Sequence, residues 1–167
     1  MDFHKEIVKL NNIERTGWKD MHIDGRLESD GEHTFFCTTL ALDIINKQKL
    51  KLDTEKVLKM LIYHEIGEID FGDHTPREYL TKEFKHNEEM KGVKRISKLA
   101  KNKEILKIWS EFEELKSEEA IFCKKIDKLA TIIQSKIYAE KYNRLDIYEE
   151  FKNTSIDIYN EFKKFID

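Results

Sequence analysis

Residues that break helices are nearly absent from this chain. Pro76 is its single proline, and three of its six glycines fall within residues 14–31. The long segments on either side carry apolar residues at helical spacing, such as Phe36 and Leu40 within residues 32–47. A β-sandwich or β-barrel needs frequent turn residues. The pattern therefore predicts an all-α protein, a bundle of about six or seven helices.

The 167 residues are enough for one domain with a substantial core and too few for two. We therefore predict a single domain over residues 1–167, with an irregular segment at residues 14–31 and an ordered loop at residues 71–76. Hydrophobic periodicity and capping residues place the helices. They are expected at residues 2–12, 32–47, 56–66, 85–100, 103–115, 117–142 and 146–165.

Charge and cysteine content exclude several classes of protein. The net charge is −3 with both signs interspersed and no basic block, so we expect no nucleic-acid partner. The N-terminal segment is charged, unlike a signal peptide, and no apolar run approaches the roughly 20 residues that span a bilayer. We expect a soluble cytoplasmic protein without a membrane partner. Cys37 and Cys123 lie among apolar residues without a CxxC pattern, which predicts buried, reduced thiols.

Polar residues interrupt the apolar faces of three predicted helices. His33 lies one turn before Phe36, His64 is followed by Glu65, and Asp127 stands in an apolar stripe. Buried polar groups cost several kcal/mol unless they are paired or bound to metal. Each alone has an ordinary explanation, a core histidine bonded to a carbonyl or a salt-bridged aspartate. Together they supply two imidazoles and two carboxylates, a set that suits Mn, Co, Fe, Ni or Zn better than calcium.

Two short strings in this region match other enzymes only superficially. His64-Glu65-x-x-Glu68 lacks the second histidine that a HExxH metalloprotease needs on the same helix face. Asp70-Phe71-Gly72 matches the kinase DFG triplet, but no glycine-rich loop or HRD motif accompanies it. The chain also has no P-loop, GxSxG or Rossmann fingerprint, so these enzyme classes are excluded.

His33, His64-Glu65 and Asp127, in this order, resemble the H…HD…D signature of the HD-domain metal-dependent phosphohydrolases, although glutamate replaces the usual aspartate at position 65. The flanking sequence is similar to the 5′-deoxynucleotidase-like branch. The resemblance covers about residues 15–142 and precedes the C-terminal helix at 146–165. Its elements are Arg15-Thr16-Gly17-Trp18, Glu28-Ser29-x-x-Glu32-His33, Glu68 with Gly72-Asp73 and Thr75-Pro76, and Glu118-Glu119-Ala120-x-Phe122 leading to Lys125-Ile126-Asp127-Lys128-Leu129.

This resemblance implies an HD-type helical bundle that hydrolyses nucleoside 5′-monophosphates, mainly deoxyribonucleotides. It also implies one divalent transition metal held by His33, His64, Glu65 and Asp127. The longer side chain of Glu65 would reach the metal from a different rotamer or through water. We interpret it as a tolerated exchange of ligand.

The resemblance further implies roles for residues around the metal. Glu68 and Asp73 would form the acid/base pair for attack on phosphorus and departure of the 5′-oxygen. Alternatively, Glu68 orients a histidine ligand and Asp73 serves a turn. Arg15 would contact the phosphate, since its planar fork suits that group. Trp18 would pack against sugar or base, or serve as a core anchor.

Other functions remain compatible with the sequence. The chain could be a nucleotide- or metal-binding regulatory module without turnover, or a phosphatase or phosphodiesterase for another small phosphoester. A helical interaction protein with internally satisfied polar groups is a further alternative. The apolar stripes of the long C-terminal helices lead us to expect a homodimer.

Overall fold

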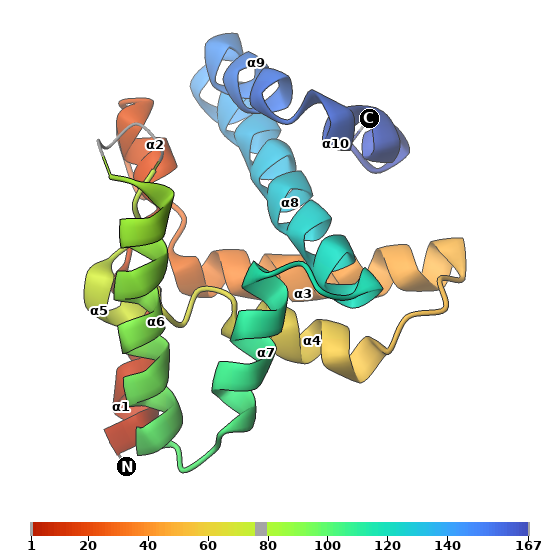
Figure 1. The fold of residues 1–167 in the computed structure, drawn as a ribbon. Coiled ribbons are helices and arrows are strands. Elements are labelled where there is room, and N and C mark those ends of the chain that lie inside the picture. Colours follow the sequence, from red (N-terminus) through yellow and green to blue (C-terminus); the bar gives the residue numbers. More distant parts are fainter. Residues whose placement is uncertain (1, 76–79, 167) are drawn as a thin grey trace.

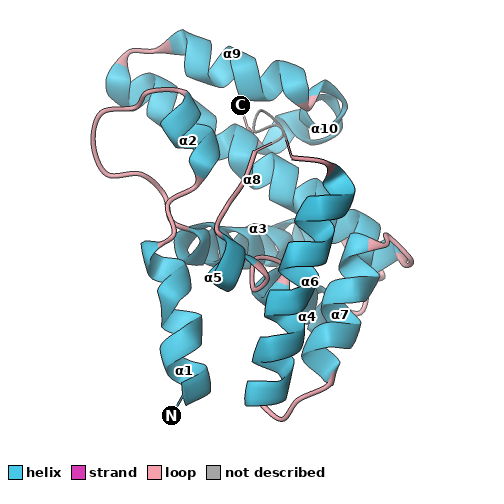
Figure 2. Cartoon of the chain, turned by 60° about the vertical axis from the view of Figure 1, so that its left-hand side comes forward, coloured by secondary structure: helices cyan, strands magenta, loops and turns pink. Residues whose placement is uncertain are grey.

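The computed structural model describes residues 2–75 and 80–166, so Pro76 and its part in the predicted loop lie outside the described residues. Helices and loops make up the described chain (Figure 2), apart from one isolated antiparallel bridge between Glu14 and Ser29. The predicted all-α class is therefore confirmed. None of the described helices is long and apolar enough to cross a membrane.

The main core lies where three helices pack on one another, and α8 crosses α3 along the centre of the molecule (Figure 1). Its innermost side chains, including Ile44, Leu61 and Ile126, are fully buried. These residues come from the apolar stripes that the sequence predicts. The helices are α3 (Asp30–Gln48), α4 (Thr54–Tyr63) and α8 (Glu118–Tyr142), with α7 (Glu104–Glu113) packed against α4 and α8.

A second apolar cluster lies beside the main core. It contains Ile66, Val93 and Trp109, and Tyr63 packs against both clusters. The end of α4 therefore lies at the junction of the two clusters. The elements around the second cluster are α1 (Asp2–Ile7), the 3-10 helix η1 (Val8–Asn12), α5 (Glu68–Phe71) and α6 (Lys82–Leu99).

A third cluster joins the first part of the chain to its last part. The short helix α2 (Thr16–Asp20) places Trp18 against Tyr138 of α8 and Phe151 of α9, with ring centroids 5.1 and 4.6 Å apart. Helix α9 (Leu145–Thr154) packs along α8. The segment that the sequence predicts as irregular is thus anchored by this tryptophan.

Some predicted boundaries are wrong. The helix expected at residues 146–165 is divided at Ser155 into α9 and α10 (Ile156–Phe162), and the 3-10 helix η2 (Lys163–Phe165) follows. Ser155 leaves the helical region, with φ −128° and ψ 44°. The residues before it, Asn153 and Thr154, favour helices weakly. After this break, Phe162 and Ile166 are buried in the main core.

Candidate metal centre

The first histidine is positioned by the start of α3. Ser29 caps this helix, because its Oγ accepts a hydrogen bond from the Glu32 backbone N–H and its own N–H donates to Glu32 Oε2 at 3.0 Å. This reciprocal capping box satisfies two backbone donors that the helix start leaves free. His33 follows in the first turn, completely buried and directed toward α4 and α8.

The second histidine lies at the end of α4. His64 Nδ1 donates a hydrogen bond to the Leu61 carbonyl at 2.6 Å. This bond fixes the ring, so that Nε2 points away from the Leu61 carbonyl. His64 Nε2 is buried and has no hydrogen-bond partner among the described residues, although Glu65 Oε1 lies 3.2 Å away. A buried imidazole nitrogen without a partner is costly, so this atom fits a metal ligand.

The four predicted metal ligands come together at this point. His33 Nε2 lies 3.2 Å from Asp127 Oδ1 and 3.7 Å from Glu65 Oε1. His33, His64, Glu65 and Asp127 each offer a donor atom, and these atoms all lie within 4.8 Å of one another. All four residues are buried. Two nitrogen and two oxygen donors at this spacing fit one divalent transition metal.

The two carboxylates of this cluster stay ionised. Burial alone would raise the pKa of Glu65, but His64 and Arg15 beside it hold that pKa well below its ordinary value. Burial also opposes ionisation of Asp127, while Lys128 and His33 hold its pKa well below its ordinary value. The site therefore presents negative charge to a cation.

Glu28 lies behind His33. Its Oε1 is 3.8 Å from His33 Nδ1, and its Oε2 accepts a hydrogen bond from Trp18 Nε1 at 2.9 Å. Burial raises the pKa of Glu28 to about 7. A carboxyl behind a ligating histidine commonly orients the ring. Trp18 itself is 1% exposed and contacts the site through Glu28, and its role in substrate binding stays a prediction.

Arg15 lies between two groups of acids. Its Nη1 is 2.5 Å from Glu65 Oε1 and 3.6 Å from Asp30 Oδ1. These carboxylates hold the guanidinium at the edge of the ligand cluster. Its predicted contact with phosphate stays a prediction, and the position is compatible with it.

A second cluster of acids adjoins the first. Asp30, Glu68 and Asp73 each place a carboxylate oxygen within 4.8 Å of the other two. Gly72 makes this possible, because its φ of 88° turns the chain directly after α5. Asp73 Oδ2 then accepts a hydrogen bond from the Thr16 backbone N–H at 2.6 Å.

Two carboxyls of this second cluster, those of Asp30 and Glu68, have raised pKa values in the free protein. Burial, with Glu65 nearby, raises the pKa of Asp30 to about 8. Burial and the Glu65 carboxylate also raise the pKa of Glu68 well above its ordinary value. Lys85 from α6 lies 3.5 Å from Glu68 Oε1 and donates to the His74 carbonyl at 2.8 Å. This lysine partly offsets the charge of the acids.

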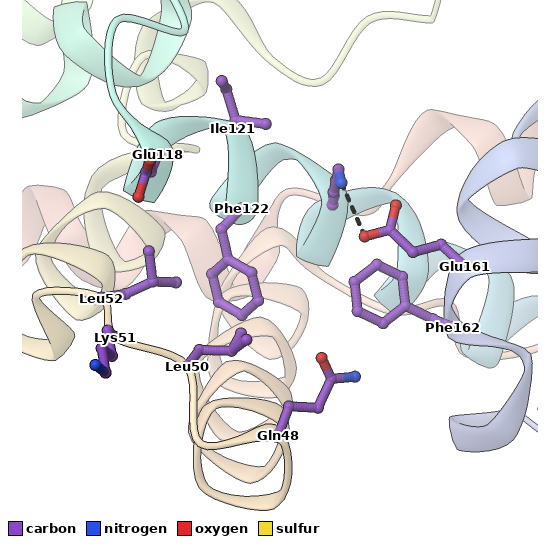
Figure 3. Close-up of a pocket in the computed structure, with 10 residues that line it drawn as sticks. Gln48, Leu50, Lys51, Leu52, Glu118, Ile121, Phe122, Glu161 and Phe162 are labelled. Atoms are coloured by element: carbon purple, nitrogen blue, oxygen red, sulfur yellow. Dashed lines mark hydrogen bonds and ion pairs between the residues drawn. The ribbon is translucent and has the colours of Figure 1, made fainter.

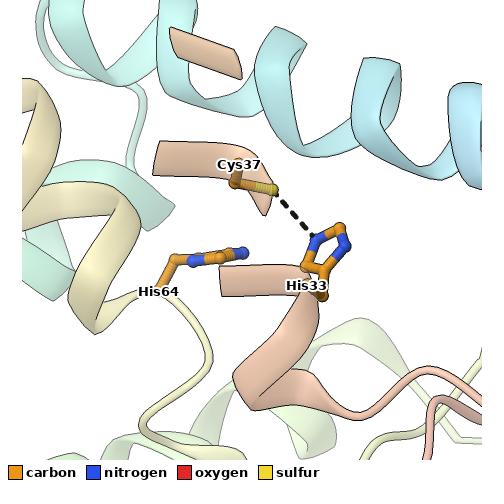
Figure 4. A group of neighbouring side chains, drawn as sticks. All are labelled: His33, Cys37 and His64. Carbon is orange, nitrogen blue, oxygen red and sulfur yellow. Dashed lines mark hydrogen bonds between the residues drawn. The ribbon is translucent and has the colours of Figure 1, made fainter. Parts of the chain in front are cut away.

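Three residues at the site escaped the sequence prediction. Asp30 and Cys37 lie three residues before and four residues after His33, so they share its helix face. This spacing is a signal that points to both. Cys37 Sγ lies 3.3 Å from His33 Nε2, as Figure 4 shows. Lys85 comes from a distant helix and leaves no comparable signal in the sequence.

A separate hollow of about 390 Å³ lies between the end of α3, the start of α8 and α10 (Figure 3). Phe122 and Phe162 line it, and an ion pair of 2.8 Å joins Lys125 and Glu161. Gln48, which also lines it, is about 22 Å from His33 along the axis of α3, at 1.5 Å per residue. The Gln48 end of the hollow is thus distant from His33.

Comparison with known proteins identifies the family. A model described as an HD domain matches residues 7–165. The chain belongs to the HD-domain family. It is 29% identical over 154 residues to the 5′-deoxynucleotidase HDDC2 of Dictyostelium discoideum, covering 87% of this chain and 80% of that protein. The HDDC2 of Danio rerio is 30% identical over 154 residues, with 90% and 75% covered.

Solved structures share the fold. A conserved hypothetical protein from Pyrococcus furiosus superposes with a TM-score of 0.78 at 26% identity, covering 95% of this chain and 89% of that chain. A predicted metal-dependent phosphohydrolase from Magnetospirillum magnetotacticum gives a TM-score of 0.66 at 23% identity, covering 96% and 89%. Both of these proteins therefore share the helical arrangement of this chain.

Proposed function

We propose that this protein is a metal-dependent phosphohydrolase that releases phosphate from nucleoside 5′-monophosphates, with deoxyribonucleotides as preferred substrates. The observation that carries the proposal is the convergence of four donor residues at the buried His64 Nε2, which makes no hydrogen bond among the described residues. The curated relatives that match most of the chain are named 5′-deoxynucleotidases. Together the donor set and the names support phosphate-ester hydrolysis over binding alone.

His33, His64, Glu65 and Asp127 are the residues that would hold the metal. When bound there, a divalent transition ion polarises a phosphoryl oxygen and lowers the pKa of water. The donor set leaves Zn, Co, Fe, Ni and Mn as candidates. Glu28 Oε1 lies on the opposite side of the His33 ring, 3.8 Å from its Nδ1, which is close enough for an ion pair and too far for a hydrogen bond.

The second acidic cluster supplies the proton transfers. Glu68, whose raised pKa keeps it protonated in the free site, donates a proton to the departing 5′-oxygen. Asp73 is held by the Thr16 backbone N–H, and it orients and deprotonates the attacking water. Lys85 beside Glu68 favours the carboxylate that forms after the proton has left.

Arg15 binds the phosphate. Its guanidinium carries several donors in one plane, and a single nitrogen, Nη1, makes both of its contacts to Glu65 and Asp30. The remaining donors can reach a phosphate oxygen. Trp18 acts on the site indirectly, through its hydrogen bond to Glu28.

The test is a phosphate-release assay on the purified protein. The protein is stripped with a chelator, resupplied with one metal at a time, and given deoxyribonucleoside and ribonucleoside 5′-monophosphates. We expect metal-dependent release of phosphate, faster with the deoxy substrates. Binding of nucleotide without release, with each of the candidate metals bound, would instead establish a regulatory module.

We also propose a cytoplasmic homodimer. Large apolar side chains are exposed on several helices, including Phe35 at 71% and Leu145 at 67%. A second copy that covers them would bury apolar surface. Light scattering during gel filtration measures the mass of the particle. A monomer at micromolar concentration would contradict the proposal.

A further inference from the structure

One buried group at the metal centre has no role in the proposed reaction. Cys37 lies one turn after His33 on α3, and its side chain is completely buried. Its Sγ lies 3.3 Å from His33 Nε2, the nitrogen that faces Asp127 and Glu65. Figure 4 shows the His64 ring directed toward the same place.

The donor atoms form two overlapping sets that share His33 and His64. Cys37, His33 and His64 each place a donor atom within 4.8 Å of the other two, as His33, His64, Glu65 and Asp127 also do. Two ligands of a tetrahedral zinc ion, a thiolate at 2.3 Å and an imidazole at 2.0–2.1 Å, lie about 3.6 Å apart. The separation of 3.3 Å between Cys37 Sγ and His33 Nε2 is close to this value.

The contact between Cys37 and His33 bears on whether the thiol only packs in the core or also binds the metal. In the free protein, His33 Nε2 is a partner of the thiol. Asp127 Oδ1 lies 3.2 Å from the same nitrogen. A cation bound to His33 Nε2 would end the contact with the thiol, and the buried sulfur would then need another partner. His64 Nε2, buried and without a hydrogen-bond partner among the described residues, points independently to a ligand at this place.

We propose that Cys37 Sγ is itself a ligand of the cation held by His33 and His64. The thiol proton leaves to the buffer as the sulfur coordinates, and no oxidant or reductant takes part. A thiolate among the ligands selects Zn²⁺, Co²⁺ or Fe²⁺ over Mn²⁺ and Mg²⁺. The inference rests on the metal centre of the proposed function and adds a ligand and a metal preference to it.

Cobalt substitution tests the inference without any assay of activity. The full-length protein is stripped and titrated with Co²⁺, and absorption is recorded in the visible and the near-ultraviolet. Visible bands report bound Co²⁺, and an intense near-ultraviolet band reports charge transfer from sulfur. We expect both in the native protein. We expect the near-ultraviolet band alone to be lost in Cys37→Ser.

Cys123→Ser is the matched control. Cys123 is also a buried free thiol, but its Sγ lies 3.6 Å from the Val57 carbonyl and belongs to neither ligand cluster among the described residues. This variant should keep both bands. Cys37→Ala and circular dichroism guard against an unfolded Cys37→Ser protein. Zn²⁺ affinity should fall at least roughly tenfold in either Cys37 variant, with Mn²⁺ affinity little changed.

Failure of this inference and failure of the metal centre itself give different results in this experiment. Stoichiometric Co²⁺ with visible bands and no near-ultraviolet band would overturn ligation by Cys37 and leave the metal centre intact. A near-ultraviolet band that persists in folded Cys37→Ser would also overturn it. No binding of Co²⁺ or Zn²⁺ at all would overturn the metal centre and this inference together.

Discussion

The turn that carries Glu65 and Glu68 depends on a close approach of two glycines. A Cβ added to Gly67 would lie 2.8 Å from Glu89 Cβ and 3.1 Å from the Glu89 carbonyl oxygen. A Cβ added to Gly92 would lie 2.9 Å from the Gly67 carbonyl oxygen. Carbon atoms normally approach to about 3.5–4.0 Å. The turn and α6 therefore pack at a distance that only glycine allows.

The expected cost of Gly67→Ala follows from two opposing effects. Gly67 has helical angles, φ −66° and ψ −25°, so alanine gains about 1 kcal/mol of helix preference. Forcing an extra carbon into a packed interface costs roughly 1–3 kcal/mol. The added carbon would meet backbone atoms of Glu89 as well as its Cβ, so the cost should lie in the upper part of this range, about 2–3 kcal/mol. The net loss in the free energy of unfolding is then about 1–2 kcal/mol. The melting temperature should fall by about 5 °C.

Urea denaturation and Co²⁺ titration measure the two consequences. Because the displaced turn carries Glu65, Gly67→Ala should also weaken metal binding. Gly17→Ala is the control, since its Cβ would lie 3.5 Å from the Phe151 ring, an ordinary contact. It should leave stability and metal affinity unchanged or slightly improve stability. A Gly67→Ala protein with native stability and affinity would refute the close approach.

Three further predictions concern the site. Glu68→Gln should lower turnover by roughly 10²–10⁴-fold without changing Co²⁺ affinity; steady-state kinetics that retain native turnover would contradict its acid role. Ser29→Ala should lower the free energy of unfolding by about 0.5–2 kcal/mol and should weaken metal binding through His33. Ser117 caps α8 in the same way, since its Oγ accepts a hydrogen bond from the Ala120 N–H at 3.2 Å. Ser117→Ala should therefore lower stability without changing metal binding. The pKa of Asp30 is raised from 3.8 to about 8, so metal-free protein loses stability as pH rises between these values, since the unfolded state releases this proton first. In urea denaturation at several pH values, Asp30→Asn should show a smaller loss of stability with rising pH. An unchanged pH dependence would argue against the raised pKa of Asp30 as its cause.

The helices were predictable where packing follows the local pattern. The stripes of α3, α4 and α8 are visible in the sequence because each buries one face in the same core. The division at Ser155 was not predictable from the pattern of apolar residues. Both α9 and α10 are amphipathic, and the break follows from the different neighbours of the two helices. Helix α2 was hidden as well. Its five residues are too few for a periodic pattern, and its place depends on Trp18 packing against distant residues.

The candidate metal ligands were predictable for a different reason. His33, His64 and Asp127 stand on apolar faces where polar groups are costly, and Glu65 followed from the resemblance to the family. Asp30 shares a helix face with His33, but it was not singled out, because an acid in the first turn of a helix is ordinarily explained by the helix dipole. Its complete burial depends on the chain that returns through Asp73. Lys85 approaches from α6, and no local pattern predicts that.

The ionisable side chains of the metal centre and of the adjoining acidic cluster together set the charge of the site. Among the described residues, six carboxyl groups lie around four cationic side chains, an excess of two acids, and protons on Glu28, Asp30 and Glu68, whose pKa values are raised, can neutralise that excess. A divalent cation would replace that compensation. Because these carboxyls lose their protons as pH rises, the stabilisation that a bound cation gives should grow with pH. The carboxyls are Glu28, Asp30, Glu65, Glu68, Asp73 and Asp127, and the cations are Arg15, Lys85, Lys124 and Lys128.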